Sequence, residues 1–126
     1  MKKILFVEDE PILIKTYRLA FEQAGYEVKI IEKLGLALKT AQQEKPDLII
    51  MEIAFCDEKN NKISKEQGIN AIASLKAGKE TKNIPIIVLT HLSLEDREQV
   101  LSLGAQDYIT KLEIMPNQII KRIERK

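Results

Sequence analysis

The sequence contains one cysteine, Cys56, and one histidine, His91. One cysteine excludes an intramolecular disulfide, and together with a single histidine it gives too few ligands for a zinc site. A chain without disulfides is typical of a reducing compartment, so we expect a cytoplasmic protein. The apolar stretches are too short for a membrane span, and the N-terminal one is too short for the core of a signal peptide.

The chain also lacks an excess of either charge, because 20 basic residues face 19 acidic ones for a net charge of +1. Without a strong field, neither nucleic acid nor a membrane surface is an expected partner. The hydrophobic fraction of 44% and the charged fraction of 31% are typical of a globular domain. The length predicts a single domain over residues 1–126.

Short apolar runs recur along the chain at residues 4–7, 28–31, 48–53 and 84–89, with a weaker run near 108–109. They are rich in isoleucine and valine and show no alternation with polar residues. This pattern is typical of strands that are buried on both faces, as in a parallel sheet.

Helical patterns separate these runs. Pro11 suits a first helical turn and Gly25 a helix end, Ser93 is a good N-cap, and Pro116 would open the last helix. The expected helices cover residues 11–25, 34–45, 69–78, 93–104 and 114–123. Alternating strands and helices predict a doubly wound α/β sandwich with right-handed crossovers. The segment 54–67 is long and polar, and we expect it to be irregular.

Ligands of such sheets bind beyond the carboxyl ends of the strands, so the residues that end each strand are the candidate site. They are Glu8 and Asp9, Glu52, Thr90, and finally Tyr108 and Lys111. Clustered carboxylates repel one another, which favours a hard divalent cation with oxygen ligands. The hydroxyl and the ammonium are then suited to bind the oxygens of an anion.

Four stretches carry a resemblance: KKILFVEDE, KPDLIIMEI, NIPIIVLT and LGAQDYITK. In this order and spacing they make the chain resemble the response-regulator receiver domain of bacterial two-component signalling. The resemblance covers essentially the full length. It implies a flavodoxin-like (βα)5 sandwich with a parallel sheet in strand order 2-1-3-4-5.

The residues at the carboxyl ends of the strands, Glu8, Asp9, Glu52, Thr90, Tyr108 and Lys111, are called the rim below. The resemblance also implies a role for each residue at the rim. Mg²⁺ would be held by Glu8, Asp9, Glu52 and the carbonyl of Ala54. Glu52 stands where the family has its phosphorylated aspartate, and Lys111 would pair with the phosphoryl oxygens. Thr90 and Tyr108 match the hydroxyl and the aromatic side chain of the family's switch. Taken singly, these residues also fit plainer roles: a strand end, a core aromatic, a surface lysine, or acids that cap the first helix.

The largest departure from the family is the glutamate at position 52. Its extra methylene displaces the carboxylate by about one C–C bond, and a misplacement on the order of 1 Å can cost ~10²-fold in rate. We therefore predict poor or absent phosphorylation. Glu52 is expected instead to approach Thr90 and Lys111 and to imitate part of the phosphorylated charge. The longer side chain either keeps the Mg²⁺ site or crowds it.

Other acids are weaker candidates for the phosphoacceptor. Asp47 precedes Glu52 by roughly 16 Å of extended strand, which excludes it. Asp57 lies just past the rim and would have to fold back. Slow phosphorylation of Glu52 itself is a further alternative.

Three smaller departures remain. His91 follows Thr90 where the family has a small residue, so its ring either narrows the pocket or has no role. Leu112 replaces a proline, which makes the family's cis peptide doubtful because a cis non-proline bond costs ~3–4 kcal/mol. Segment 54–67 is either a partner-binding loop or an insertion that costs little closure entropy.

We therefore expect a receiver-like signalling module that is not an enzyme and that binds proteins through residues 93–104, 108 and 114–123. The partners would be a histidine kinase, another signalling protein or a second copy of the chain. The first rival is an active receiver that is phosphorylated at Glu52 or Asp57 with Mg²⁺. The second is a flavodoxin-like cofactor carrier or phosphatase, which is disfavoured because acids follow the first strand and no glycine-rich phosphate loop is present.

Overall fold

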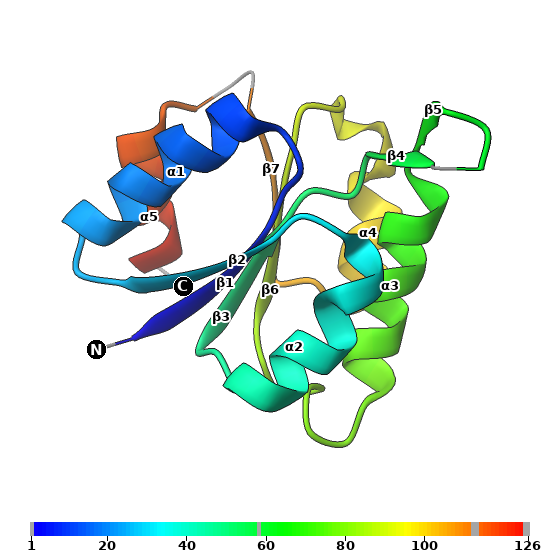
Figure 1. Ribbon diagram of the computed structural model, residues 1–126, viewed down its shortest axis with the longest axis horizontal. Coiled ribbons are helices and arrows are strands. Elements are labelled where there is room, and N and C mark those ends of the chain that lie inside the picture. Colours follow the sequence, from blue (N-terminus) through cyan, green and yellow to red (C-terminus); the bar gives the residue numbers. More distant parts are fainter. Residues whose placement is uncertain (1, 58, 112–113, 125–126) are drawn as a thin grey trace.

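The computed structural model describes residues 2–57, 59–111 and 114–124, and its centre is a parallel sheet (Figure 1). The five strands are β1 (Lys3–Val7), β2 (Glu27–Ile31), β3 (Leu48–Met51), β6 (Ile86–Thr90) and β7 (Asp107–Thr110). They pair in parallel in the order β2-β1-β3-β6-β7. The predicted order 2-1-3-4-5 is confirmed, because β6 and β7 are the fourth and fifth strands of this sheet along the chain. The two intervening strands, β4 and β5, form a separate hairpin that is described below.

The burial of the strands explains their composition. All residues of β3, β6 and β7 are buried, as are the last four of β1. Strand β2 lies at the edge of the sheet, where exposed and partly buried residues alternate before the buried Ile31, so the expectation of a strand buried on both faces is wrong there. Side chains on both faces of the inner strands are removed from water, so these strands consist almost entirely of apolar residues.

Helices cover both faces of the sheet (Figure 1). On one face, α1 (Pro11–Gln23) and α5 (Pro116–Glu124) pack Phe21 and Ile119 against the strands. On the other face lie α2 (Ala37–Glu44), α3 (Glu66–Ala77) and α4 (Arg97–Ser102). The 3-10 turns η1 (Leu34–Leu36) and η2 (Leu94–Asp96) precede α2 and α4. The expected alternation of strands and helices is therefore confirmed.

The expectation of an irregular segment at residues 54–67 is wrong. Strands β4 (Phe55–Asp57) and β5 (Lys62–Ser64) pair there as an antiparallel hairpin. Phe55 is buried and anchors the hairpin to the core. The turn is stabilised locally, because Asp57 and Asn60 accept backbone N–H groups and Asn61 adopts a left-handed φ of 57°. Asparagine tolerates that conformation better than most residues.

Helix α3 begins directly beside the end of β3. A side chain at Gly68 would place its Cβ 2.2 Å from the carbonyl oxygen of Ile53, so only glycine permits this approach. The contact fixes the backbone that follows Glu52. In the part of the chain that the structure describes, no helix is both long and apolar enough to cross a membrane.

Candidate functional site

The carboxyl ends of β1, β3 and β7 bring two acids and one lysine into contact. The ammonium of Lys111 lies 2.6 Å from Glu8 Oε1 and 3.2 Å from Glu52 Oε1. The side chains are 8%, 2% and 1% exposed, respectively. One cation therefore bridges two carboxylates that are almost completely removed from water.

The Glu8 carboxylate is also held by its own backbone. Glu8 Oε2 accepts the N–H groups of Asp9 at 3.0 Å and Glu10 at 3.2 Å. Burial raises the pKa of Glu8 above its ordinary value, although the bond and the charge of Lys111 oppose that shift. Glu8 is therefore an acid whose charge depends on its lysine partner.

The Glu52 carboxylate uses both oxygens as hydrogen-bond acceptors. Oε2 accepts the N–H groups of Ile53 at 2.8 Å and Ala54 at 3.2 Å. Oε1 accepts the N–H of His91 at 3.1 Å in addition to the Lys111 ammonium. Burial alone would raise the pKa of Glu52, but Lys111, the Thr90 hydroxyl and these N–H donors outweigh burial and lower it. Glu52 is therefore ionised.

The imidazole of His91 completes this arrangement. Its Nδ1 lies 2.8 Å from Glu52 Oε1, and its side chain is 49% exposed. An ionised carboxylate only accepts hydrogen bonds, so Nδ1 carries the proton of this contact. The sequence indicated a bulky ring beside Thr90, but no pattern in it indicated a bond to Glu52.

The two switch candidates lie on adjacent strands. Tyr108 is 1% exposed, and its hydroxyl donates to the carbonyl of Ser93 at 2.7 Å. Burial raises the pKa of Tyr108 to about 12, and nearby acids, Asp96 foremost, add to the shift. Thr90 Oγ1 accepts the N–H of Leu92 at 3.1 Å. These two bonds hold the segment between β6 and α4 against the core.

The expected magnesium ligands are not arranged as a metal site. Across residues 2–57, 59–111 and 114–124, no three acidic, histidine or cysteine side chains gather around a common point. The Lys111 ammonium contacts two of the expected ligands, Glu8 and Glu52, whereas Asp9 lies beside them and is partly exposed. Ala54 is buried, and its N–H already donates to Glu52. The donor set therefore does not fit Mg²⁺ in this arrangement, because lysine neutralises the acids.

The remaining candidates lie elsewhere. The carboxylate of Asp57 accepts the N–H of Lys59 within the hairpin turn. Asp47 accepts the N–H of Lys3 where β1 begins, at the opposite end of the sheet. Leu112 lies outside the described residues, so the expectation about its peptide bond stays a prediction. Helix α1 is capped by Glu10, whose side chain accepts the N–H of Ile12, and not by Glu8 or Asp9.

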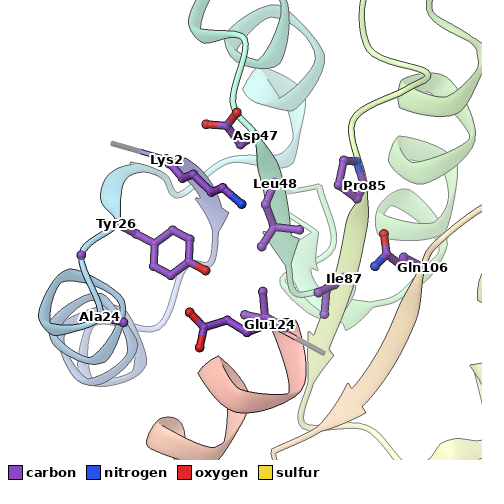
Figure 2. Close-up of a pocket in the computed structure, with 11 residues that line it drawn as sticks. Lys2, Ala24, Tyr26, Asp47, Leu48, Pro85, Ile87, Gln106 and Glu124 are labelled. Atoms are coloured by element: carbon purple, nitrogen blue, oxygen red, sulfur yellow. The ribbon is translucent and has the colours of Figure 1, made fainter. Parts of the chain in front are cut away.

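A hollow lies at the opposite end of the sheet, where the strands begin (Figure 2). This cavity of about 590 Å³ has an apolar floor that includes Leu48 and Ile87. Lys2, Tyr26 and Glu124 line it as polar groups. None of the predicted site residues lines this cavity, so the cavity is not the predicted phosphoryl site.

Comparisons with known proteins agree with the observed fold. The response regulator receiver domain family matches residues 4–124. The chain is 35% identical over 98% of its length to the phosphate regulon regulator PhoB of Pseudomonas aeruginosa, of which it spans 50%. Chemotaxis response regulator CheY4 of Vibrio cholerae superposes with a TM-score of 0.81, at 25% identity over 99% of this chain and 98% of CheY4.

A further solved structure is the receiver domain of the sensor histidine kinase PA1611 from Pseudomonas aeruginosa, which has magnesium coordinated in its active site cleft. It superposes with a TM-score of 0.80, at 26% identity over 98% of this chain and 95% of that domain. The family match covers nearly the whole chain, and the sheet order agrees with it. The chain belongs to the response regulator receiver domain family of two-component signalling.

Proposed function

We propose that this receiver domain signals through protein binding, without enzymatic activity, and that Glu52 serves as a built-in negative charge in place of a phosphorylated aspartate. The observation that carries the proposal is the set of contacts made by the Glu52 carboxylate. It engages Lys111 and the Thr90 hydroxyl, the groups that the family resemblance assigns to a phosphoryl group. The domain would then rest in one signalling state without needing a phosphodonor.

The same contacts make Glu52 a poor nucleophile. Attack on phosphorus needs a carboxylate oxygen with an accessible lone pair and a clear in-line path. Both oxygens of Glu52 already accept N–H donors, and the side chain is 1% exposed. The His91 ring and the Lys111 ammonium both contact Oε1. A phosphodonor would have to displace these groups before reaction.

We also propose that Mg²⁺ binds this rim weakly. A divalent ion would have to displace the Lys111 ammonium from Glu8 and Glu52, and the displaced ammonium would lose two partners in a buried place. An isothermal titration with Mg²⁺ should give weaker binding to the parent chain than to a Lys111→Met variant. Equal affinities would contradict this competition.

Phosphorylation provides the test of the built-in charge. The parent chain and Glu52→Asp are incubated with acetyl phosphate and Mg²⁺, and intact masses are measured before and after treatment with alkali, which cleaves acyl phosphates. We expect an alkali-labile phosphoryl group on Glu52→Asp and none on the parent. An alkali-labile phosphoryl group on Glu52 of the parent would refute the proposal in favour of an active receiver.

The proposed binding surface is the face formed by residues 93–104 and 114–123. Tyr108, which was expected to belong to it, is 1% exposed and is bonded to the Ser93 carbonyl, so it does not contribute a surface side chain. Two large apolar side chains are exposed there, Leu94 at 48% and Met115 at 64%. We propose a histidine kinase, another signalling protein or a second copy of the chain as the partner. Leu94→Asp should weaken self-association in sedimentation experiments, or capture of a purified kinase. Leu19→Asp, which changes a 56% exposed leucine on α1, is the matched control and should leave both unchanged.

A further inference from the structure

Glu52 and His91, which both depart from the family pattern, contact each other. A buried carboxylate holds one ring nitrogen, and the side chain that carries the ring is half exposed. We propose that Nε2 of His91 accepts a phosphoryl group from a small acyl phosphate. The inference rests on the proposed function, because it requires Glu52 to remain unphosphorylated.

The hydrogen bond fixes which tautomer of the imidazole is present. Nδ1 lies 2.8 Å from Glu52 Oε1, and the carboxylate can only accept, so the proton sits on Nδ1. In the neutral ring Nε2 then carries the free lone pair. None of the described residues forms a hydrogen bond with Nε2, and the side chain that carries it is 49% exposed.

The backbone holds the ring in this orientation. The N–H of His91 donates to the same Glu52 oxygen at 3.1 Å, so the main chain and the ring of one residue converge on one acceptor. Thr90, the preceding residue, accepts the N–H of Leu92 and fixes the turn. A nucleophile whose partner is fixed in this way loses little conformational freedom in the reaction.

The reaction balances without a further reactant. The lone pair of Nε2 attacks phosphorus while the bond from phosphorus to the bridging acyl oxygen breaks. The carboxylate of the donor leaves with that electron pair. The ring gains positive charge as the N–P bond forms, and ionised Glu52 stabilises that charge through the Nδ1–H bond. No proton has to move, and the product is phosphohistidine.

In this proposal the nucleophile is residue 91 and not residue 52. Glu52 keeps a carboxylate at the rim but cannot present it to phosphorus, because N–H groups occupy both oxygens. Its charge acts instead through the imidazole, as a buried acid acts through histidine in a catalytic triad. Glu52 is therefore a positioning residue for His91.

The composition of the chain makes the test direct. His91 is the only histidine, so any phosphohistidine on a tag-free chain must be at this position. Phosphohistidine survives alkali and is cleaved by acid, whereas an acyl phosphate is cleaved by alkali. The tag-free chain is treated with acetyl phosphate, and the intact mass is measured after separate acid and alkali treatments. We expect an acid-labile, alkali-stable phosphoryl group.

Two variants separate a chemical role from a structural one. His91→Asn retains a side-chain donor near the Nδ1 position but has no nucleophile, so it should fold with an unchanged melting temperature and lose the alkali-stable group. Glu52→Gln removes the negative charge that stabilises the ring as the N–P bond forms, so the rate of labelling should fall about tenfold or more. An alkali-stable phosphoryl group that persists in His91→Asn, or its absence from the parent, would overturn the inference.

The outcomes also distinguish this inference from the proposed function. An alkali-labile group on Glu52 of the parent refutes the built-in charge, whatever happens at His91. A parent with no phosphoryl group of either kind refutes the role of His91 and leaves the built-in charge supported.

Discussion

The bridging lysine offers the sharpest physical test of this rim. Lys111→Met keeps the length and the apolar stem of the side chain but removes the ammonium. Glu8 and Glu52, which are 2% and 1% exposed, would then be two buried carboxylates without a shared cation. Removing one partner from a buried ion pair typically destabilises a protein by about 3–5 kcal/mol. For a domain of this size, the melting temperature should fall by about 4 °C per kcal/mol.

The pH dependence of this loss follows from the two carboxyl groups. In the parent, the raised pKa of Glu8 means that stability falls as pH rises above the ordinary value of 4.5. The lowered pKa of Glu52 means that stability is lost as pH falls below 4.5. Without Lys111, both carboxyl groups lose the cation that lowers their pKa, so both bind protons more readily in the folded state than they do in the parent. The penalty should therefore be largest near neutral pH and shrink as pH approaches 4.5.

Urea unfolding followed by circular dichroism at several pH values measures this penalty. Lys15→Met removes the same charge from an exposed position on α1 and should have little effect. The double variant Glu8→Gln/Lys111→Met should recover part of the lost stability, because it removes one of the two unpaired charges. A loss below about 1 kcal/mol at neutral pH, or a loss that does not vary with pH, would refute the assignment of Lys111 as their shared partner.

Other predictions test the framework around the rim. Arg122→Ala should cost about 3 kcal/mol in urea unfolding, because it leaves Asp107, which is 2% exposed, without its two bonds to the guanidinium. Gly68→Ala should cost about 1–3 kcal/mol in the same assay, because the new Cβ would meet the carbonyl oxygen of Ile53. Tyr108→Phe should cost about 1 kcal/mol and speed amide exchange in the turn before α4, because a carbonyl there loses its hydroxyl partner. If one of these variants has the same free energy of unfolding as the parent, the contact that this variant was chosen to test does not stabilise the fold.

The sequence predicted the sheet and most helix starts because local physics determines them. Apolar runs without alternation fit only strands covered on both faces, and the run at residues 48–53 includes β3 (Leu48–Met51). Pro11 begins α1, and the Ser93 side chain accepts the N–H of Glu95 at the start of η2. These signals depend on a few neighbouring residues, so they can be read without knowledge of the tertiary structure.

The hairpin and the charge contacts depend on information that lies far apart in the chain. Neither strand of the hairpin exceeds three residues, which is too short for a periodic pattern, and its turn depends on polar side chains. Lys111 and Glu8 are 103 residues apart, and only the closed fold shows that their side chains meet. The sequence could place both residues at one rim. It could not indicate that lysine would take the place expected for a metal.

Positions 52 and 91 depend on each other. A carboxylate at the end of β3 that is one methylene longer reaches the N–H and the imidazole of His91, as well as the N–H groups of the two residues that follow it. An aspartate would withdraw the carboxylate from the ring by about one C–C bond and leave Nδ1 without its acceptor. Conversely, a small residue at 91 would leave one lone pair of Glu52 buried without its partner. The glutamate and the histidine therefore form one unit, which explains how this rim keeps a buried carboxylate at the position that the resemblance assigns to the phosphorylated aspartate.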